Sequence, residues 1–148
     1  MSSFTSTPDD GFQAVLFDLD GTLVDTAPDM VAVLQAMQTA RDVEPVAYEL
    51  GRSYVSNGAI GLLRLGFPEV DVDFGDAMHH EYLERYAEAI CEGSQVFAGL
   101  DALLDHLDAA DCPWGVVTNK PEHLTAPLLE ALGLATRSAC TVSGDSLP

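Results

Sequence analysis

Two aspartates near the start of the chain are spaced so that they can act together. An apolar run, residues 14–17, is followed by Asp18 and Asp20, with Gly21 and Thr22 directly after them. Such a run is typical of a buried strand in a parallel sheet, and open α/β sheets bind ligands at the carboxyl ends of their strands. Two carboxylates that crowd there need a hard cation such as Mg²⁺ to neutralise them. An aspartate held against a bound phosphate can then attack phosphorus as a nucleophile.

Residues 18–25 (Asp-Leu-Asp-Gly-Thr-Leu-Val-Asp) resemble the first motif of the haloacid dehalogenase (HAD) superfamily, in its phosphoglycolate phosphatase-like branch. The resemblance implies that Asp18 is the nucleophile that becomes an aspartyl phosphate, and that Asp20 is the general acid/base. It also implies a magnesium site at the Asp18 carboxylate and the Asp20 carbonyl, and phosphate binding at Gly21. The alternative without function is a strand-to-turn junction in which these residue types serve only turn chemistry.

A second apolar run, residues 114–117, ends in Thr118-Asn119-Lys120-Pro121 and is similar to the second motif of the same family. The resemblance implies that the Thr118 hydroxyl binds the transferring phosphoryl group and that Asn119 positions the substrate or the nucleophile. Pro121 suits the first turn of a helix, where backbone N–H groups favour an anion. Alone, a strand that ends in Thr-Asn is a weak signal, but here it follows the first motif at the spacing of the family.

The family has two further motifs, and neither is visible in the sequence. The third is a lysine, usually within Lys-Pro, and the fourth is a strand that ends in Gly-Asp with more acids for the metal. Lys120 is the only lysine among 148 residues, and it belongs to the second motif. Gly144-Asp145 follows the apolar residues 139–142, which correspond to the third strand of relatives. We therefore expect the chain to be the N-terminal part of a longer phosphatase, ending just before the third-motif lysine.

The pattern of the whole chain predicts an α/β fold, a doubly wound parallel-sheet core of which this is the N-terminal part, with an inserted helical cap. Residues 12–26 and 95–148 are assigned to the core and residues 27–94 to the cap. Apolar residues recur at helical spacing from 28 to about 41, and again in a second group further on. That second group is Tyr82, Leu83, Tyr86 and Ile90. In the resembling branch such a cap closes over the core and excludes water.

Two more helices are predicted in the core, on either side of the second motif. The first carries leucines on one face, namely Leu100, Leu103, Leu104 and Leu107. The second runs from Pro121 to Leu132, with Gly133 as its C-terminal cap.

A glycine-rich turn within the cap, residues 51–61, is a candidate part of the substrate site. Arg52 could pair with a substrate carboxylate or phosphate, while Ser56, Asn57 and the Gly58 amide offer hydrogen bonds. The alternative is an Asn-capped helix with a surface arginine. This cap contains no lysine, whereas phosphonate-cleaving relatives need one for a Schiff base. Dehalogenase relatives lack the second aspartate, so Asp20 favours phosphoryl transfer.

Composition excludes several classes of partner. A formal net charge of −18, with six basic residues, leaves no patch that could bind nucleic acid or an anionic membrane. The charge fits either a high-salt habitat or an ordinary acidic protein. No segment predicts export or membrane insertion, so we expect a cytoplasmic monomer or homodimer. The three cysteines, an odd and widely separated set, are predicted to be reduced core thiols, namely Cys91, Cys112 and Cys140. The histidines show no ligand spacing.

These features together predict a Mg²⁺-dependent phosphomonoester hydrolase that acts on a small phosphorylated metabolite, either phosphoglycolate or a sugar phosphate. An amino-sugar phosphatase, such as one for N-acetylmuramate 6-phosphate, is the close alternative, and a phosphomutase is less favoured. An alternative of another class is a non-catalytic fragment that lacks the motif lysine and the distal metal acids.

Overall fold

The computed structural model describes residues 13–146, and these form an α/β fold with a parallel sheet, as the sequence predicts. Three strands pair side by side in the order β1-β4-β5, and both pairings are parallel. They are β1 (Val15–Phe17), β4 (Trp114–Val117) and β5 (Thr141–Val142). Because all three strands run in one direction, their carboxyl ends meet at one edge of the sheet. Both aspartates and Thr118 follow strands that end at this edge.

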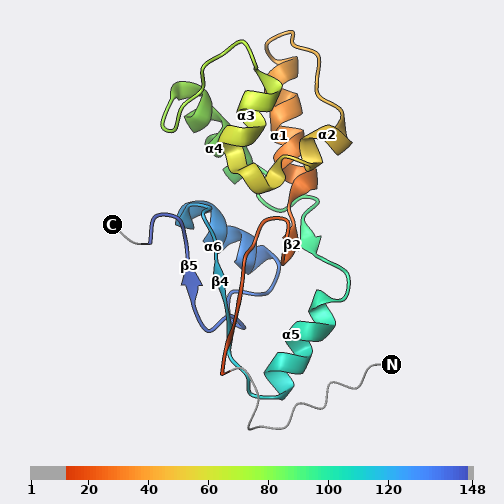
Figure 1. Cartoon of the computed structure of the whole chain (residues 1–148), viewed down its shortest axis with the longest axis vertical. Coiled ribbons are helices and arrows are strands. Elements are labelled where there is room, and N and C mark those ends of the chain that lie inside the picture. The colour runs from red at the N-terminus through yellow and green to blue at the C-terminus, as the bar shows by residue number, and fades with distance from the viewer. Residues whose placement is uncertain (1–12, 147–148) are drawn as a thin grey trace.

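A second, antiparallel pair of strands lies where the chain leaves the sheet and where it returns. It consists of β2 (Val24–Asp25) and β3 (Gln95–Val96), with Val24 opposite Val96. The segment that β2 and β3 bracket is helical, and Figure 1 shows it as a body above the sheet. Its helices are α1 (Ala27–Thr39), α2 (Tyr48–Arg52), the 3-10 turn Val55–Asn57, α3 (Gly58–Gly66) and α4 (Ala77–Glu88).

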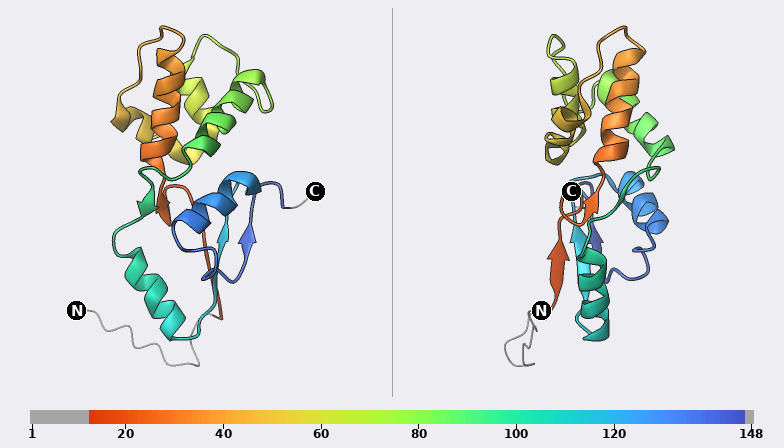
Figure 2. Two further views of the ribbon diagram at one scale, coloured as in Figure 1. Left: turned by 180° about the vertical axis from the view of Figure 1, so that it is seen from behind. Right: turned by 90° about the vertical axis from the view of Figure 1, so that its right-hand side faces the viewer.

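Two helices accompany the sheet below, α5 (Leu100–Ala109) and α6 (Glu122–Ala131). The views in Figure 2 show the same division from behind and from the side, with the helical body above and the sheet body below. Within the described chain, no helix has the length and apolar character that crossing a membrane requires.

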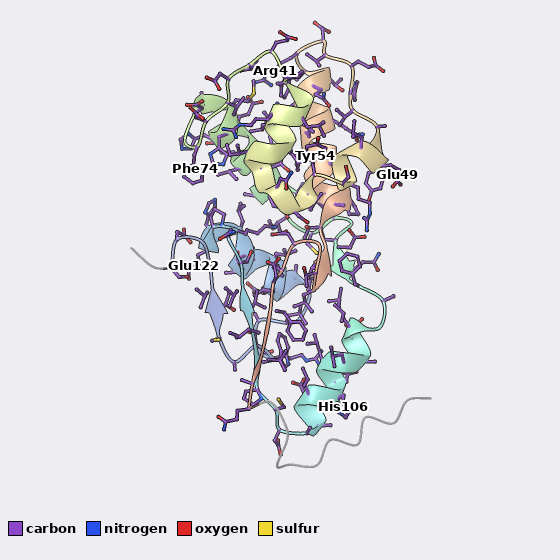
Figure 3. The ribbon with its side chains drawn as sticks, viewed as in Figure 1. Arg41, Glu49, Tyr54, Phe74, His106 and Glu122 are labelled. Carbon is purple, nitrogen blue, oxygen red and sulfur yellow. The ribbon has the colours of Figure 1, made fainter. Side chains whose placement is uncertain are left out.

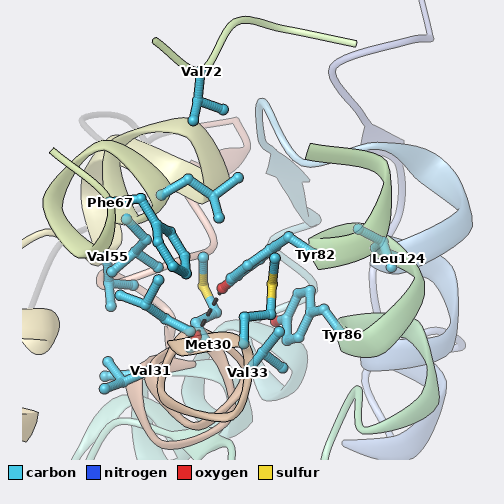
Figure 4. Close-up of a cluster of buried hydrophobic side chains, with 14 residues drawn as sticks. Met30, Val31, Val33, Val55, Phe67, Val72, Tyr82, Tyr86 and Leu124 are labelled. Atoms are coloured by element: carbon cyan, nitrogen blue, oxygen red, sulfur yellow. Dashed lines mark hydrogen bonds between the residues drawn. The ribbon is translucent and has the colours of Figure 1, made fainter. Parts of the chain in front are cut away.

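The side chains form two apolar clusters, one in each body. The upper cluster brings α1, α3 and α4 together, and most of its side chains appear in Figure 4. The lower cluster packs Trp114 and Val116 of the sheet against Leu104 of α5 and against Leu128 of α6. Burial of a side chain of this size is worth about 1.5–3 kcal/mol, so each cluster contributes substantially to holding its own body together.

Several local predictions are confirmed, and two are wrong. Gly133 adopts φ 71° after α6, which is the left-handed conformation of a C-terminal cap. Leu104 is fully buried, whereas Leu103 on the same helix is 39% exposed, so the leucine face of α5 is narrower than expected. Cys91 and Cys112 are half-buried but Cys140 is exposed, so the three cysteines are not all core thiols.

Every one of the six basic side chains pairs with a carboxylate. Arg52 pairs with Asp25, and Lys120 pairs with Asp20. The other four basic side chains make five pairs, namely Arg41–Glu81, Arg85–Glu81, Arg64–Asp73, Arg137–Asp105 and Arg137–Asp108. The Arg52–Asp25 pair joins α2 of the helical segment to β2. The Lys120–Asp20 pair lies within the sheet body, and Lys120 reaches the helical segment through its hydrogen bond to Tyr86 of α4.

Asp29 joins the two points at which the chain passes between the bodies. Its carboxylate, 5% exposed in the first turn of α1, accepts hydrogen bonds from the backbone N–H groups of Gly93 and Ser94. The Ser94 hydroxyl donates a third bond to Oδ2 at 2.5 Å. Residues 93–94 lie just before β3, so this cluster fixes the outgoing and returning segments against each other.

We predict that Asp29→Ala lowers the free energy of unfolding by about 3 kcal/mol, because hydrogen bonds to a charged group are strong and the Ser94 groups lose their partner. Urea denaturation followed by circular dichroism measures this. Ser94→Ala removes one bond and serves as the matched control, with an expected loss of about 1 kcal/mol. An Asp29→Ala loss no larger than that of the control would contradict the clamp.

Candidate active site

A cavity of about 500 Å³ lies between the carboxyl edge of the sheet and the helical body. The sheet side contributes polar groups, namely Asp18, Asp20, Thr118, Asn119, Lys120 and Asp145. The helical side is mostly apolar, with Met30, Val55, Ala59, Ile60, Phe74 and Leu83. In Figure 3, Phe74 lies at the lower margin of the helical body and Glu122 at the top of the sheet body, so the two bodies face each other here. The volume falls within the range of about 300–1,000 Å³ that is usual for small-molecule sites.

Asp18 and Asp20 stand at the end of β1 in different environments. Asp18 is exposed, and its Oδ1 accepts the Leu19 N–H at 2.8 Å, which leaves Oδ2 without a partner among residues 13–146. Asp20 is half-buried, and its Oδ1 accepts bonds from Lys120 Nζ at 2.7 Å and from Thr26 Oγ1 at 2.8 Å. One carboxylate is therefore accessible and orientated by the backbone, and the other is held by a cation and a hydroxyl.

Lys120 is a site residue to which the sequence analysis gave no role. Its side chain is 5% exposed, and Nζ donates to Asp20 and to the Tyr86 hydroxyl, the latter at 2.6 Å. Burial lowers the pKa of Lys120, and the Asp20 carboxylate opposes this. Since Nζ contacts a carboxylate directly, we treat the pair as charged. The signal in the sequence was the isolation of this residue, as the only lysine, directly after the second motif.

Thr118 and Asn119 lie at the end of β4, beside the aspartates. Thr118 is 6% exposed, and its Oγ1 accepts the Lys120 N–H at 3.1 Å, so the hydroxyl hydrogen stays available. Asn119 is exposed and lines the same cavity. The backbone of Asn119 lies so close to Gly144 that a Cβ added to Gly144 would meet the Asn119 oxygen at 2.1 Å, and the loop after β5 therefore packs tightly on this segment.

The glycine-rich turn reaches the cavity through part of its length. Ser56 and Asn57 line the cavity. A Cβ added to Gly21, which has φ 77°, would meet Ser56 Oγ at 3.2 Å, so the turn lies directly over the first motif. Asn57 occupies the N-cap position of α3 but makes no side-chain capping bond. The alternative predicted an Asn-capped helix. Asn57 does stand at the N-cap, but its side-chain amide does not cap the helix and is left for another partner.

Arg52 is not among the residues that line the cavity. Its Nη1 donates to both carboxylate oxygens of Asp25, at 2.8 and 3.0 Å, and also to the Tyr48 hydroxyl. The bond to Asp25 raises the pKa of Arg52 above its ordinary value, with a smaller contribution from Tyr48. In this conformation the guanidinium is committed to a carboxylate of the protein.

The N-terminus of α6 is already occupied by an anion of the protein. The helix begins at Glu122 with Pro121 at the N-cap, and the Glu122 N–H donates to Asp145 Oδ1 at 2.8 Å. A carboxylate at this end of a helix is favoured by the helix dipole. Asp145 therefore caps α6 from the loop after β5, at the rim of the cavity.

The oxygen atoms on the sheet side of the cavity are ligands that suit a hard cation. Asp18 Oδ2 accepts no bond from the described residues, and the Asp20 carbonyl has no backbone partner. Oxygen ligands of this kind suit Mg²⁺, which usually keeps several waters and needs only one or two carboxylates. Within residues 13–146 there is no cluster of three or more His, Cys, Asp or Glu side chains that could hold a metal. The two groups thus fit part of a magnesium site.

His79 lies on the helical side, where the sequence predicted only a structural role. It is 5% exposed and its Nδ1 accepts the Gly75 N–H at 3.0 Å, so the neutral ring carries its hydrogen on Nε2. Burial lowers the pKa of His79, and the neighbouring His80 lowers it further. Phe74 packs against the ring with centroids 4.9 Å apart. This side of the cavity is therefore uncharged as well as largely apolar.

The parallel sheet brings two aspartates, a threonine and a buried lysine together at the carboxyl ends of its strands. A family model described as haloacid dehalogenase-like hydrolase matches residues 12–148. The chain belongs to this family.

Named relatives are phosphatases. The chain is 41% identical over 135 residues to a phosphoglycolate phosphatase of Xanthomonas campestris pv. campestris (strain 8004). This alignment covers 91% of the chain and 61% of that protein. It is also 41% identical over 134 residues to an N-acetylmuramic acid 6-phosphate phosphatase of Pseudomonas putida. That alignment covers 90% of the chain and 60% of the relative. The chain thus spans about three-fifths of the length of these curated relatives.

A solved structure with the same fold is that of a predicted phosphoglycolate phosphatase from Haemophilus somnus. It superimposes with a TM-score of 0.77 at 26% sequence identity, covering 93% of this chain and 64% of that chain. The match extends over both bodies, so the helical body belongs to the fold of the relative as well as the sheet does.

We predict that Lys120→Met destabilises the protein by about 3 kcal/mol, because it leaves the Asp20 carboxylate without its cation in a half-buried position. Chemical denaturation measures the change. Arg64→Met is the matched control, since its pair with Asp73 is exposed (57% and 71%) and such pairs contribute little.

The double variant Lys120→Met/Asp20→Asn tests the cause. If the unpaired charge is responsible, the double variant regains much of the stability that the single variant loses. A double variant as unstable as the sum of the two single variants would contradict this explanation.

Proposed function

We propose that the chain carries the nucleophile, the acid/base and part of the phosphate and metal site of a Mg²⁺-dependent phosphomonoester hydrolase. The observation that supports this best is the meeting of Asp18, Asp20, Thr118 and Lys120 in one cavity at the carboxyl edge of the sheet. The phosphatase relatives support the same reaction class.

The proposed reaction has two steps. Asp18 Oδ2, which the structure leaves accessible, attacks phosphorus, and the bond from phosphorus to the leaving oxygen breaks. Asp20, which rests as the carboxylate paired with Lys120, takes up a proton on Oδ2 as the substrate binds and gives that proton to the leaving oxygen, so the products are an aspartyl phosphate and an alcohol. Asp20 then removes a proton from water, which attacks phosphorus and releases phosphate, restoring Asp18 and the protonated Asp20.

Other residues of the edge hold the substrate in this scheme. The Thr118 hydroxyl and the Asn119 amide donate to phosphoryl oxygens, with the Gly21 amide beside them. Asp18 and the Asp20 carbonyl hold Mg²⁺, which neutralises charge on the phosphoryl group when it is bound. Lys120 orientates Asp20 through Oδ1 and so leaves Oδ2 for the transferred proton.

The helical body is proposed to act as a cap. We assign residues 12–26 and 95–148 to the core and residues 27–94 to the cap, which closes over the cavity and excludes water from the aspartyl phosphate. Ser56 and Asn57 face the cavity from this side and are proposed to contact the substrate. Arg52 joins them only if it exchanges Asp25 for an anionic group of the substrate. A cytoplasmic location and a monomeric or homodimeric state remain part of the proposal.

The substrate is proposed to be a small phosphorylated metabolite, either phosphoglycolate or a sugar phosphate. An N-acetylmuramate 6-phosphate-type substrate is the second candidate, and a relative that carries this name supports it. Comparison of kcat/KM for the two esters separates them. A chain that releases no phosphate from either supports the alternative of a non-catalytic fragment.

Asp18→Asn is expected to lower phosphate release by at least about a thousandfold while the protein stays folded, because the change removes the nucleophile and little volume. Release from p-nitrophenyl phosphate and from phosphoglycolate, together with circular dichroism, measures both effects. Asp101→Asn, at an exposed position on α5, is the matched control and should retain full activity. Retained phosphatase activity in Asp18→Asn would overturn the assignment.

Removal of divalent cations is expected to abolish phosphate release, and added Mg²⁺ to restore it, because the two aspartates otherwise repel the phosphate. Treatment with EDTA, dialysis and titration with MgCl₂ provide the measurement. Ca²⁺ serves as the comparison ion and should restore little activity, since its longer metal–oxygen distances suit a different geometry. Undiminished turnover in EDTA would remove Mg²⁺ from the mechanism.

A further inference from the structure

Two tyrosines on α4 place their hydroxyl groups in the same region but use them differently. Tyr82 and Tyr86 are one helical turn apart, and each is 1% exposed. The Tyr82 hydroxyl donates to the Met30 carbonyl at 2.8 Å, the bond drawn as a dashed line in Figure 4. The Tyr86 hydroxyl contacts Lys120 Nζ at 2.6 Å, with Nζ 4.5 Å from the centre of its ring.

The direction of the Tyr86 bond determines what its hydrogen can do. An ammonium group has three hydrogens and no lone pair, so Nζ donates and the tyrosine oxygen accepts. Among residues 13–146, no acceptor takes the hydrogen of the Tyr86 hydroxyl. Burial raises the pKa of Tyr86, and the Asp20 charge raises it further, so the group keeps this hydrogen. Tyr86 is thus a donor with one unused hydrogen, and it lines the cavity.

The position of this donor indicates which part of a substrate it meets. Asp18, Thr118 and Asn119 occupy the sheet side, where the phosphoryl oxygens are proposed to bind. Tyr86 comes from the helical side, and one lysine nitrogen links it to Asp20, the proposed acid for the leaving oxygen. An ester that lies between the two sides has its bridging oxygen next to both groups.

We propose that the Tyr86 hydroxyl donates a hydrogen bond to the leaving oxygen of the phosphate ester. The inference rests on the proposed phosphatase function. As the bond to phosphorus breaks, negative charge develops on that oxygen, and a fixed neutral donor stabilises it more in the transition state than in the bound substrate. Lys120 occupies one acceptor position of the tyrosine oxygen, which leaves the hydroxyl hydrogen for the substrate.

The dependence on the leaving group tests this role. Tyr86→Phe keeps the ring over Lys120 and removes only the hydroxyl. We expect kcat for phosphoglycolate, whose leaving alkoxide is strongly basic, to fall about 10- to 100-fold. For p-nitrophenyl phosphate, whose leaving group is stable as an anion, kcat should fall less than about threefold, because little stabilisation is needed. Inhibition by inorganic phosphate should not change.

Tyr82→Phe is the matched control, because it removes the neighbouring hydroxyl of the same helix, which is committed to a backbone carbonyl. It should lower the thermal midpoint and leave the ratio of the two kcat values unchanged. Equal losses for both substrates in Tyr86→Phe would overturn the inference and leave the proposed function standing. No release of phosphate from either substrate by the unaltered chain would overturn the proposed function, and this inference with it.

A second variant covers the case in which Tyr86→Phe does not fold. Incorporation of 3-fluorotyrosine at position 86 keeps the hydroxyl and makes it a stronger donor. The ratio of kcat for phosphoglycolate to kcat for p-nitrophenyl phosphate should then rise. An unchanged ratio in this variant contradicts a bond to the leaving oxygen.

Discussion

The buried ion pair between Lys120 and Asp20 is the interaction on which the geometry of the site depends. It joins the ends of β1 and β4, and through the Tyr86 hydroxyl it also reaches α4 of the helical body. Thr26 adds the start of α1 to the same carboxylate oxygen. Three regions that lie far apart in the sequence, residues 20–26, α4 and the end of β4, therefore converge on two side chains. An unpaired charge in such a position costs free energy of folding. The Lys120–Asp20 pair therefore fixes the positions of these segments relative to one another.

The helical body and the sheet body each have an apolar cluster, Leu124 of α6 packs into the upper one, and polar contacts also cross between the bodies. Arg52 with Asp25 and Tyr86 with Lys120 are two such contacts. Hydrogen bonds and ion pairs have defined partners and directions, whereas apolar packing is less directional. A movement of one body against the other would have to exchange these partners for water or substrate. The arrangement suits a cap that opens and closes.

The sequence predicted the elements that local patterns determine. The two motif strands, the helical insertion and the left-handed Gly133 are confirmed because apolar runs, helical spacing and turn chemistry act over short distances. The sequence did not predict the partners of long side chains. Arg52 turned to Asp25, 27 residues away, and Lys120 to Asp20, 100 residues away, and such choices depend on the packed structure. Cys140 was predicted to be a core thiol because its neighbours are apolar, but its exposure depends on which surface the finished sheet leaves uncovered. Leu103 shares the leucine face of α5 and is nevertheless 39% exposed.

The complete pairing of the basic side chains affects how a substrate reaches the protein. Each of the six cations is neutralised by a carboxylate of the same chain, while a formal net charge of −18 remains. The long-range field at the surface is therefore that of the surplus carboxylates, and an approaching phosphate ester meets repulsion before it meets the donors of the cavity. Dissolved salt shortens the range of that repulsion to about 10 Å at 0.1 M. Diffusional capture of an anion by this protein therefore becomes faster as ionic strength rises, opposite to the behaviour of enzymes that attract their substrates through a basic surface.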